Sequence, residues 1–358
     1  HDHPSHVLRA FVPPPALDAY LALRALNVET ALIPDAASTP AVAALRYRFW
    51  QDAVSAALTP PHAAPKEPIA TLLAHAAAAA ASSPSAGSSS GSGSGSRGAT
   101  SAYKAPVLSL PRLRRLLSAR ASRVEAPPPA TPDALDAHAE TTYASLLYLT
   151  LSAARVAHPH VDHVASHVGK AQGIVAALRG LPLLVEGAPR AQRGNTPQAA
   201  GLAPLGTSRT ALPLPLSTLA DCGVRDEDLY RYGPGAENVR DAVFAVATRA
   251  HDHLRAAREL AQAIRAGREP GHAFEHEEDL AVEDAARYAS AGGGLGGDMA
   301  EAERELERGF GILMQGVAVG LWLERLQRAD FDVWDRRVRG REWKLPWRAF
   351  WGWRRREF

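Results

Sequence analysis

The stretch from residue 161 to residue 182, VDHVASHVGKAQGIVAALRGLP, constrains the fold more than any other part of the chain. Its apolar residues recur at alternating steps of three and four, which places them on one face of an α-helix. Gly169 and Gly173 are four apart, so a second face is nearly bare backbone. Each mid-helix glycine costs about 1 kcal/mol relative to alanine, and we therefore expect another helix to approach closely here. The sequence Gly180-Leu181-Pro182 predicts that the helix ends at residue 180.

Most of the remaining chain also has the pattern of helices, without the period-2 alternation of strands and without internal repeats. The expected helices are residues 15–33, 40–58, 66–80, 108–121, 132–154, 160–180, 214–221, 237–266, 276–289 and 299–327. Two stretches rich in Ala, Ser, Gly and Pro, at about 76–102 and 186–209, are typical of low-complexity insertions and of unstructured chain. The sequence therefore predicts an all-α fold, with residues 1–358 forming one domain.

Composition excludes several classes of protein. The chain has 40 Lys and Arg against 38 Asp and Glu, and this balance argues against nucleic acid as a partner. Cys222 is the only cysteine, which excludes an intramolecular disulfide and a Cys-based zinc site. We find no apolar run of the roughly 18–20 residues needed to span a bilayer. The chain begins with His1 and not with methionine, so we expect the natural N-terminus to be missing, and a targeting peptide cannot be judged from this chain.

A polar stripe on the central helix carries His163, His167 and Lys170 at positions i, i+4 and i+7. The two histidines have the spacing of metal ligands on one helical face. No glutamate follows in an HExxH arrangement, so a structural role is favoured over metal binding. We expect no metal and no cofactor.

The order of segments resembles the squalene/phytoene synthase family of all-helical enzymes, which join two prenyl diphosphates. The segments that carry this resemblance are ALRALNVETALIPD (22–35), ALRYRFWQDAV (44–54), GKAQGIVAALRG (169–180) and LPLPLSTLADCGV (212–224). The resemblance implies a single helical bundle around a central cavity. In that family two D-x-x-x-D motifs on facing helices hold Mg²⁺, which grips the diphosphate leaving group.

The chain departs from the synthase pattern at both aspartate motifs. Ala31 and Leu32 stand where the family has its leading aspartates, and of that motif only Asp35 remains. Arg179 is kept in the second motif, but Gly180 and Leu184 occupy the places of its carboxylates. A magnesium-dependent prenyl transfer is therefore not expected, and no catalytic residue is assigned.

A narrower resemblance accounts for these departures. The chain is similar to the mitochondrial complex I assembly factor 6 family, a non-catalytic branch of the synthase fold. The residues that carry this are ALRALNVETA (22–31), LRYRFWQDAV (45–54), ASLLYLTL (144–151), HVDHVASHVGKAQGIVAALRGLP (160–182), NVRDAVFAVATRAHDHLRAAR (238–258) and LERLQRADFDVW (323–334). The resemblance implies a pseudoenzyme on the matrix side of the mitochondrial inner membrane. Its partners would be complex I assembly intermediates or other assembly factors, with inner-membrane lipid as a further partner.

Two groups of residues are candidates for these contacts. The expected cavity or partner-binding residues are Asn27, Glu29, Asp35, Trp50, His163, His167, Lys170, Gln172 and Arg179. The C-terminal stretch REWKLPWRAFWGWRRREF (341–358) alternates indole rings with arginines, a composition that suits a membrane interface. The candidate membrane contacts are Trp347, Trp351, Trp353 and Arg354, and the alternative is a terminal helix whose rings fill the core.

Two alternatives to a silent scaffold remain open. One is an isoprenoid diphosphate transferase with relocated acidic ligands. The other is an isoprenoid- or lipid-binding protein without turnover, in which Lys170 and Arg179 hold an anionic head group.

Overall fold

The computed structural model describes residues 2–59, 66–82, 108–187, 212–269, 271, 281–290 and 298–358. Within these ranges the chain is helical and contains no β-strand, which confirms the all-α prediction. The longer helices are α2 (Leu17–Ala31), α4 (Pro40–Leu58), α5 (Pro68–Ser82), α6 (Leu110–Ser122), α9 (Pro159–Gly187), α13 (Val239–Arg265), α15 (Met299–Leu313), α16 (Gln315–Arg328) and α18 (Leu345–Arg355). Shorter helices are α1 (His3–Leu8), α3 (Ile33–Ala36), α7 (Pro132–Ala139), α8 (Ser145–Ala153), α11 (Leu216–Asp221), α12 (Asp226–Tyr232), α14 (Ala281–Ser290) and α17 (Arg336–Arg339).

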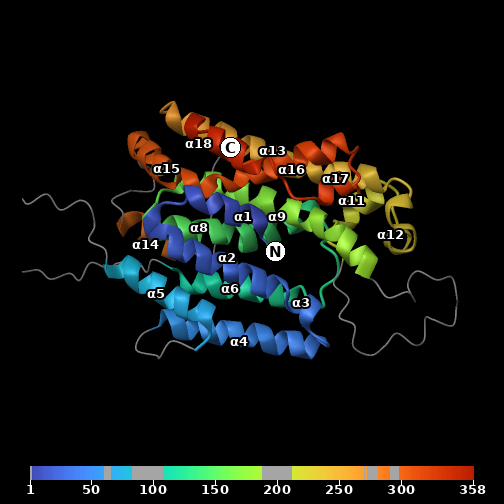
Figure 1. The fold of residues 1–358 in the computed structure, drawn as a ribbon, viewed down its shortest axis with the longest axis horizontal. Coiled ribbons are helices and arrows are strands. Elements are labelled where there is room, and N and C mark those ends of the chain that lie inside the picture. The colour runs from blue at the N-terminus through green and yellow to red at the C-terminus, as the bar shows by residue number, and fades with distance from the viewer. Residues whose placement is uncertain are drawn as a thin grey trace, which may run out of the picture.

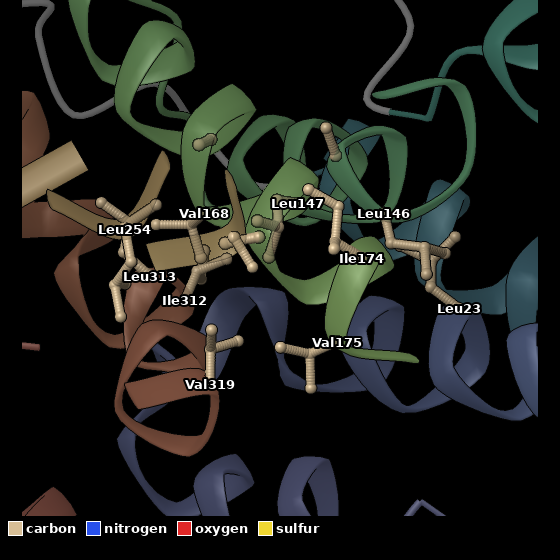
Figure 2. Packing of buried hydrophobic residues seen from close by; sticks show 14 of the residues in the cluster. Leu23, Leu146, Leu147, Val168, Ile174, Val175, Leu254, Ile312, Leu313 and Val319 are labelled. Carbon is tan, nitrogen blue, oxygen red and sulfur yellow. The ribbon is translucent and has the colours of Figure 1, made fainter. Parts of the chain in front are cut away.

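Helix α9 lies in the middle of the bundle. Figure 1 shows α2, α4, α5 and α6 below it and α15, α16 and α18 along the upper edge of the view. α9 packs against α13 along much of its length and also contacts α7, α15 and α16. Its apolar stripe joins side chains from both halves of the chain in one core, as Figure 2 shows for Val168 and Ile174 beside Leu254 and Leu147.

The two glycines of α9 form the close contact that their spacing predicts. Their partners are α7 and the π-helical turn Glu140–Ala144 that follows it. A Cβ atom at Gly169 would overlap the backbone of Ala144, and one at Gly173 would lie 2.5 Å from the Cβ of Ala139. The glycines therefore permit a backbone approach that alanine would prevent. The expected helix 132–154 is helical from Pro132 to Ala153, with the π turn near its centre.

Several expected boundaries are wrong. The central helix does not end at residue 180 but continues to Gly187 with Pro182 inside it. Leu181 and Val185 are buried on this last turn, and that packing outweighs the hydrogen bond that proline removes. The expected helix 299–327 is divided at Met314, and the short helix α12 was not expected.

The low-complexity stretches also differ from expectation where the structure describes them. Residues 76–82 belong to helix α5, since alanine is the best helix former and Leu73 and Ala76 are buried. Residues 83–102 and 188–209 lie outside the described residues, as does the start of the expected helix 276–289.

The expectation that no segment is long and apolar enough to span a membrane is also wrong. By length and composition Pro159–Glu186 passes that test. This segment is the central helix of the bundle, and 56% of its most apolar window is buried inside the protein. Packing against the neighbouring helices accounts for its apolar composition.

Candidate functional site

A cavity of about 560 Å³ lies between α2, α9 and α16, with α17 at one side. Its walls are mainly apolar, and they include Val175 of α9 and Val319 of α16, which lie side by side in Figure 2. The lining residues come from six parts of the chain: Asp2, Pro4, Arg24, Asn27, Val28, Ala31, Leu32, Tyr143, Gln172, Val175, Ala176, Arg179, Gly180, Leu183, Gln315, Ala318, Val319, Trp322, Val333, Val338 and Arg339. This is the central cavity that the resemblance to the synthases implies.

Three arginines line the cavity. Arg24 of α2 is 7% exposed, and its guanidinium lies 3.9 Å from the carboxylate of Asp2. Arg339 of α17 forms a two-pronged ion pair with Glu186, at 2.7 and 3.0 Å. Arg179 of α9 is exposed. The cavity therefore joins apolar walls to guanidinium groups, which attract anions.

The cavity does not fit the magnesium sites of the synthases. Ala31, Leu32 and Gly180, at the positions where the sequence analysis expected the family's aspartates, all line it. Asp2 is the one carboxylate among the lining residues, and it pairs with Arg24. Mg²⁺ is held through carboxylate oxygens, and the cavity offers no pair of them. In the part of the chain that the structure describes, no three His, Cys, Asp or Glu side chains are grouped to hold a metal ion.

Three of the candidate cavity residues line the cavity: Asn27, Gln172 and Arg179. Asn27 is held in place by Arg120, which donates 2.7 Å and 2.5 Å hydrogen bonds to its backbone and side-chain oxygens. Gln172 donates to Gln315 at 3.3 Å, and its own Oε1 is buried without a hydrogen-bond partner. Both amides are thus fixed polar groups on an otherwise apolar wall.

Three other candidates lie away from this cavity. Glu29 and Trp50 line a separate groove of about 490 Å³ between α2 and α4. Asp35 is exposed on the short helix α3 and lines neither space. The remaining carboxylate of the first motif therefore does not face the cavity.

The two histidines of α9 face α13 and not the cavity. His163 is buried, and its ring lies 5.2 Å from that of His167. The Nδ1 atoms of His167 and His253 are 3.0 Å apart, and His253 reaches Asp136 of α7 through Nε2 at 2.9 Å. This chain of polar contacts links α9, α13 and α7, which indicates a structural role for the two histidines.

Asp136 closes this chain as a carboxylate. Burial alone would raise its pKa, but hydrogen bonds from His253 and Arg249 outweigh burial and hold the pKa below its usual range. Arg249 donates from Nε at 2.8 Å. The ionised group therefore fixes α7 against α13.

Lys170 does not share the cavity with Arg179. Its ammonium group lies 3.7 Å from Glu140 in the π-helical turn. Glu140 also accepts a 2.7 Å hydrogen bond from Ser166 and a short one from the hydroxyl of Tyr148. The lysine thus supports the contact between α9 and the preceding helices.

The C-terminal candidates divide into two groups. Trp347 and Trp351 are 67% and 51% exposed, and Arg354 is also exposed. Trp353 points the other way, with its ring centroid 5.7 Å from that of Phe11 and 5.9 Å from that of Phe310. Three of the four candidates therefore share the solvent face, and Trp353 packs against the core.

Sequence analysis missed Asp2, the N-cap of α1, and four further polar or aromatic residues of the cavity: Arg24, Gln315, Trp322 and Arg339. The further residues lie on α2, α16 and α17, and no local motif relates them. A usable signal existed for Arg24 alone, which falls inside the first matching segment ALRALNVETALIPD.

Comparisons with known proteins agree with this geometry. The family model described as squalene/phytoene synthase matches residues 1–275. A Mus musculus protein described as NADH dehydrogenase (ubiquinone) complex I, assembly factor 6, is 26% identical over 347 residues, covering 96% of this chain and 76% of its own length. The Drosophila melanogaster homolog of that factor is 28% identical, covering 98% of this chain and 79% of its own length. The Bos taurus factor is 30% identical over 265 residues, 74% of this chain and 64% of its own.

The family model covers more than half of the chain, and two of the helices that it spans, α2 and α9, form part of the cavity wall. The part of the wall from α16 and α17 lies beyond the matched residues. The resemblance expected from the sequence is thereby confirmed: this chain belongs to the squalene/phytoene synthase family and is similar to relatives named complex I assembly factor 6.

Proposed function

We propose that this protein is an assembly factor for mitochondrial respiratory complex I and that it does not catalyse prenyl transfer. The observation that carries the second half is the lining of the cavity, where Ala31, Leu32 and Gly180 replace the expected carboxylates. The first half is supported by relatives named as complex I assembly factors over nearly the whole chain.

The physical case for silence is electrostatic. Release of an allylic diphosphate needs positive charge that is placed to grip the leaving group, which in the synthase family is magnesium. The three cavity arginines would repel a divalent cation, and a single carboxylate engaged by Arg24 is a poor ligand for it. In this proposal the protein retains the helical bundle of the family and binds its partners through the outer surface of that bundle.

The proposed place of work is the matrix side of the mitochondrial inner membrane. The partners would be early assembly intermediates of complex I or other assembly factors. The large surface of the bundle, not the chemistry of the cavity, would engage them.

The test is complex I content in mitochondria that lack this gene, measured on native gels with in-gel NADH dehydrogenase activity. Deletion should lower complex I, and the wild-type gene should restore it. A variant that removes the two remnants of the aspartate motifs, Asp35→Ala/Arg179→Ala, should restore it equally well. Normal complex I in the deletion strain would overturn the proposal.

A second candidate function is favoured by the arginines around the apolar cavity. An anionic amphiphile, such as an isoprenoid phosphate, could place its head group near Arg24 and Arg179 and its chain along Val175, Val319 and Trp322. Saturable binding of farnesyl diphosphate in EDTA, measured by calorimetry and lost in Arg24→Gln/Arg179→Gln, would support it. Absence of binding heat with the wild-type protein at two well-separated temperatures would exclude it.

A further inference from the structure

Helix α18 presents a row of large aromatic rings to solvent. Trp343, just before the helix, is 73% exposed, and Trp347, Phe350 and Trp351 are 67%, 45% and 51% exposed. Within the helix, the spacing of three and one residues keeps the rings of Trp347, Phe350 and Trp351 on one side. We call this set, Trp343 included, with the neighbouring Lys344, Arg354 and Arg355, the aromatic face of α18. Figure 1 places α18 at the upper edge of the molecule.

The opposite side of the same helix already holds it on the bundle. Leu345 and Ala349 are 1% and 0% exposed, and Trp353 stacks near Phe11 and Phe310. A helix of this length needs only one apolar side to dock on a protein core. The second apolar side is therefore unused by the fold.

The charges around the aromatic face are mostly positive. Residues 341–355 contain Arg341, Lys344, Arg348, Arg354 and Arg355 against Glu342, and Glu357 follows. Arg356 is turned toward the core, where it pairs with Glu307 at 2.8 Å and lies over the ring of Trp353. Glu342 is paired with Arg325 at 3.4 Å, which removes one of the two negative charges from the surface. Lys344, Arg354 and Arg355 lie over the rings of Trp343, Phe350 and Trp351, at 5.5, 6.0 and 5.9 Å from the ring centroids.

A groove of about 600 Å³ begins at the edge of this face. Its lining residues include Trp351, Arg355, Arg348 and Arg258. Arg348 forms an ion pair with Glu324 at 3.1 Å. Arg355 lies over the ring of Trp351 and forms no ion pair with a carboxylate of the described residues. Guanidinium groups beside an indole ring suit a phosphate whose ester chains continue into an apolar layer.

We propose that the aromatic face of α18 is a membrane-contact surface that lies flat on a bilayer containing anionic phospholipid. Indole rings insert at the boundary between head groups and acyl chains, and the arginines meet lipid phosphates. Convex rings with a basic rim match a uniform anionic surface better than they match a protein pocket. The inference rests on the proposed inner-membrane location and is independent of the role in complex I assembly.

The experiment is co-sedimentation of the full chain with phosphatidylcholine vesicles, made with and without phosphatidylglycerol. The wild-type protein should bind the mixed vesicles and bind pure phosphatidylcholine much more weakly. Trp347→Ala/Trp351→Ala should lower the apparent affinity about tenfold or more. Arg354→Glu/Arg355→Glu should remove the preference for phosphatidylglycerol.

A matched control comes from α4, where Leu45 and Phe49 are 67% and 50% exposed. Leu45→Ala/Phe49→Ala removes a similar exposed apolar area on another face and should leave vesicle binding unchanged. Circular dichroism and thermal unfolding of each variant show that the fold is intact.

Two results would overturn the proposal. The first is a wild-type protein that binds neither kind of vesicle. The second is an α18 double-tryptophan variant that binds vesicles like the wild type, in which case failure to restore complex I would mark the face as a protein-docking surface. Loss of vesicle binding with full restoration of complex I would support the membrane contact and show that assembly does not need it.

Discussion

Helix α9 uses glycine in opposite ways in two regions: around Gly169 in its N-terminal half, which we call the packed end, and around Gly180 near its C-terminus, which we call the cavity end. At Gly169 the backbone of Ala144 lies so close that no side chain fits, whereas a Cβ at Gly180 would meet nothing within 4 Å. The first glycine joins the helix to its neighbours, and the second faces the cavity. The contrast indicates that the packing of this fold is demanding while its cavity tolerates change.

The largest effect is expected at the packed end. Gly169→Ala forces the π-helical turn away from α9, because the new Cβ would overlap backbone and not a flexible side chain. We expect the free energy of unfolding to fall by about 3 kcal/mol. Urea denaturation measures this free energy. An unchanged midpoint would show that the contact between Gly169 and Ala144 has room for a methyl group.

A smaller effect on the free energy of unfolding, which depends on pH, tests whether the residues just before α9 belong to the packed region. His158 is 0% exposed, and burial, with His160 nearby, lowers its pKa to about 4. The unfolded histidine titrates near 6.5, so its stabilising contribution is complete above that pH and is lost as pH falls toward 4. Wild-type stability should include a loss of roughly 2–3 kcal/mol from this residue over that interval.

His158→Asn should reduce this pH dependence, because asparagine does not titrate. Its amide oxygen can still accept the hydrogen bond from the His160 N–H, so the local structure should be kept. The measurement is urea unfolding at pH 7 and pH 4.5 for both proteins. His251→Asn on the exposed side of α13 is the control. An equal pH slope in the His158 variant and the wild type would place the histidine outside the packed region.

The cavity end should respond in the opposite direction to the packed end. Gly180→Ala places a methyl group in open space and removes backbone freedom from the unfolded chain. We expect a gain of about 0.5–1 kcal/mol in unfolding free energy. A loss as large as that of Gly169→Ala would erase the distinction between the two ends.

The smallest effect is expected for a carboxylate restored at the cavity. Ala31 is exposed at the end of α2, and Ala31→Asp should change unfolding free energy by less than about 0.5 kcal/mol. Complex I should still be restored in the deletion strain by this variant. A variant that folds but cannot restore complex I would mean that the cavity wall takes part in assembly.

The same contrast explains what the sequence could predict. The close helix contact at Gly169 and Gly173 was predictable because two glycines four residues apart on one helix make a local signal. The apolar stripe likewise follows from the spacing of its residues. The end of α9 was not predictable, because the burial of Val185 depends on neighbours distant in the chain. Likewise, the contact of His167 with His253 joins positions 86 residues apart, and no spacing rule relates them.

The candidate site was predicted in part for the same reason. Asn27, Gln172 and Arg179 lie on segments that resemble the synthases, and they do line the cavity. Glu29 and Asp35 lie on the same first segment but face elsewhere, because the helix turns them toward α4 or into solvent. Arg339 comes from a four-residue helix that sequence periodicity could not identify.

The central claim is that the cavity has lost the groups that magnesium chemistry requires. The most direct test is release of diphosphate from farnesyl diphosphate by the purified protein, with excess Mg²⁺ and, in parallel, with EDTA. The account predicts no release above the protein-free rate under either condition. Sustained turnover that EDTA abolishes, and that Arg24→Gln/Arg179→Gln reduces, would contradict it and restore the reading of an active prenyl transferase.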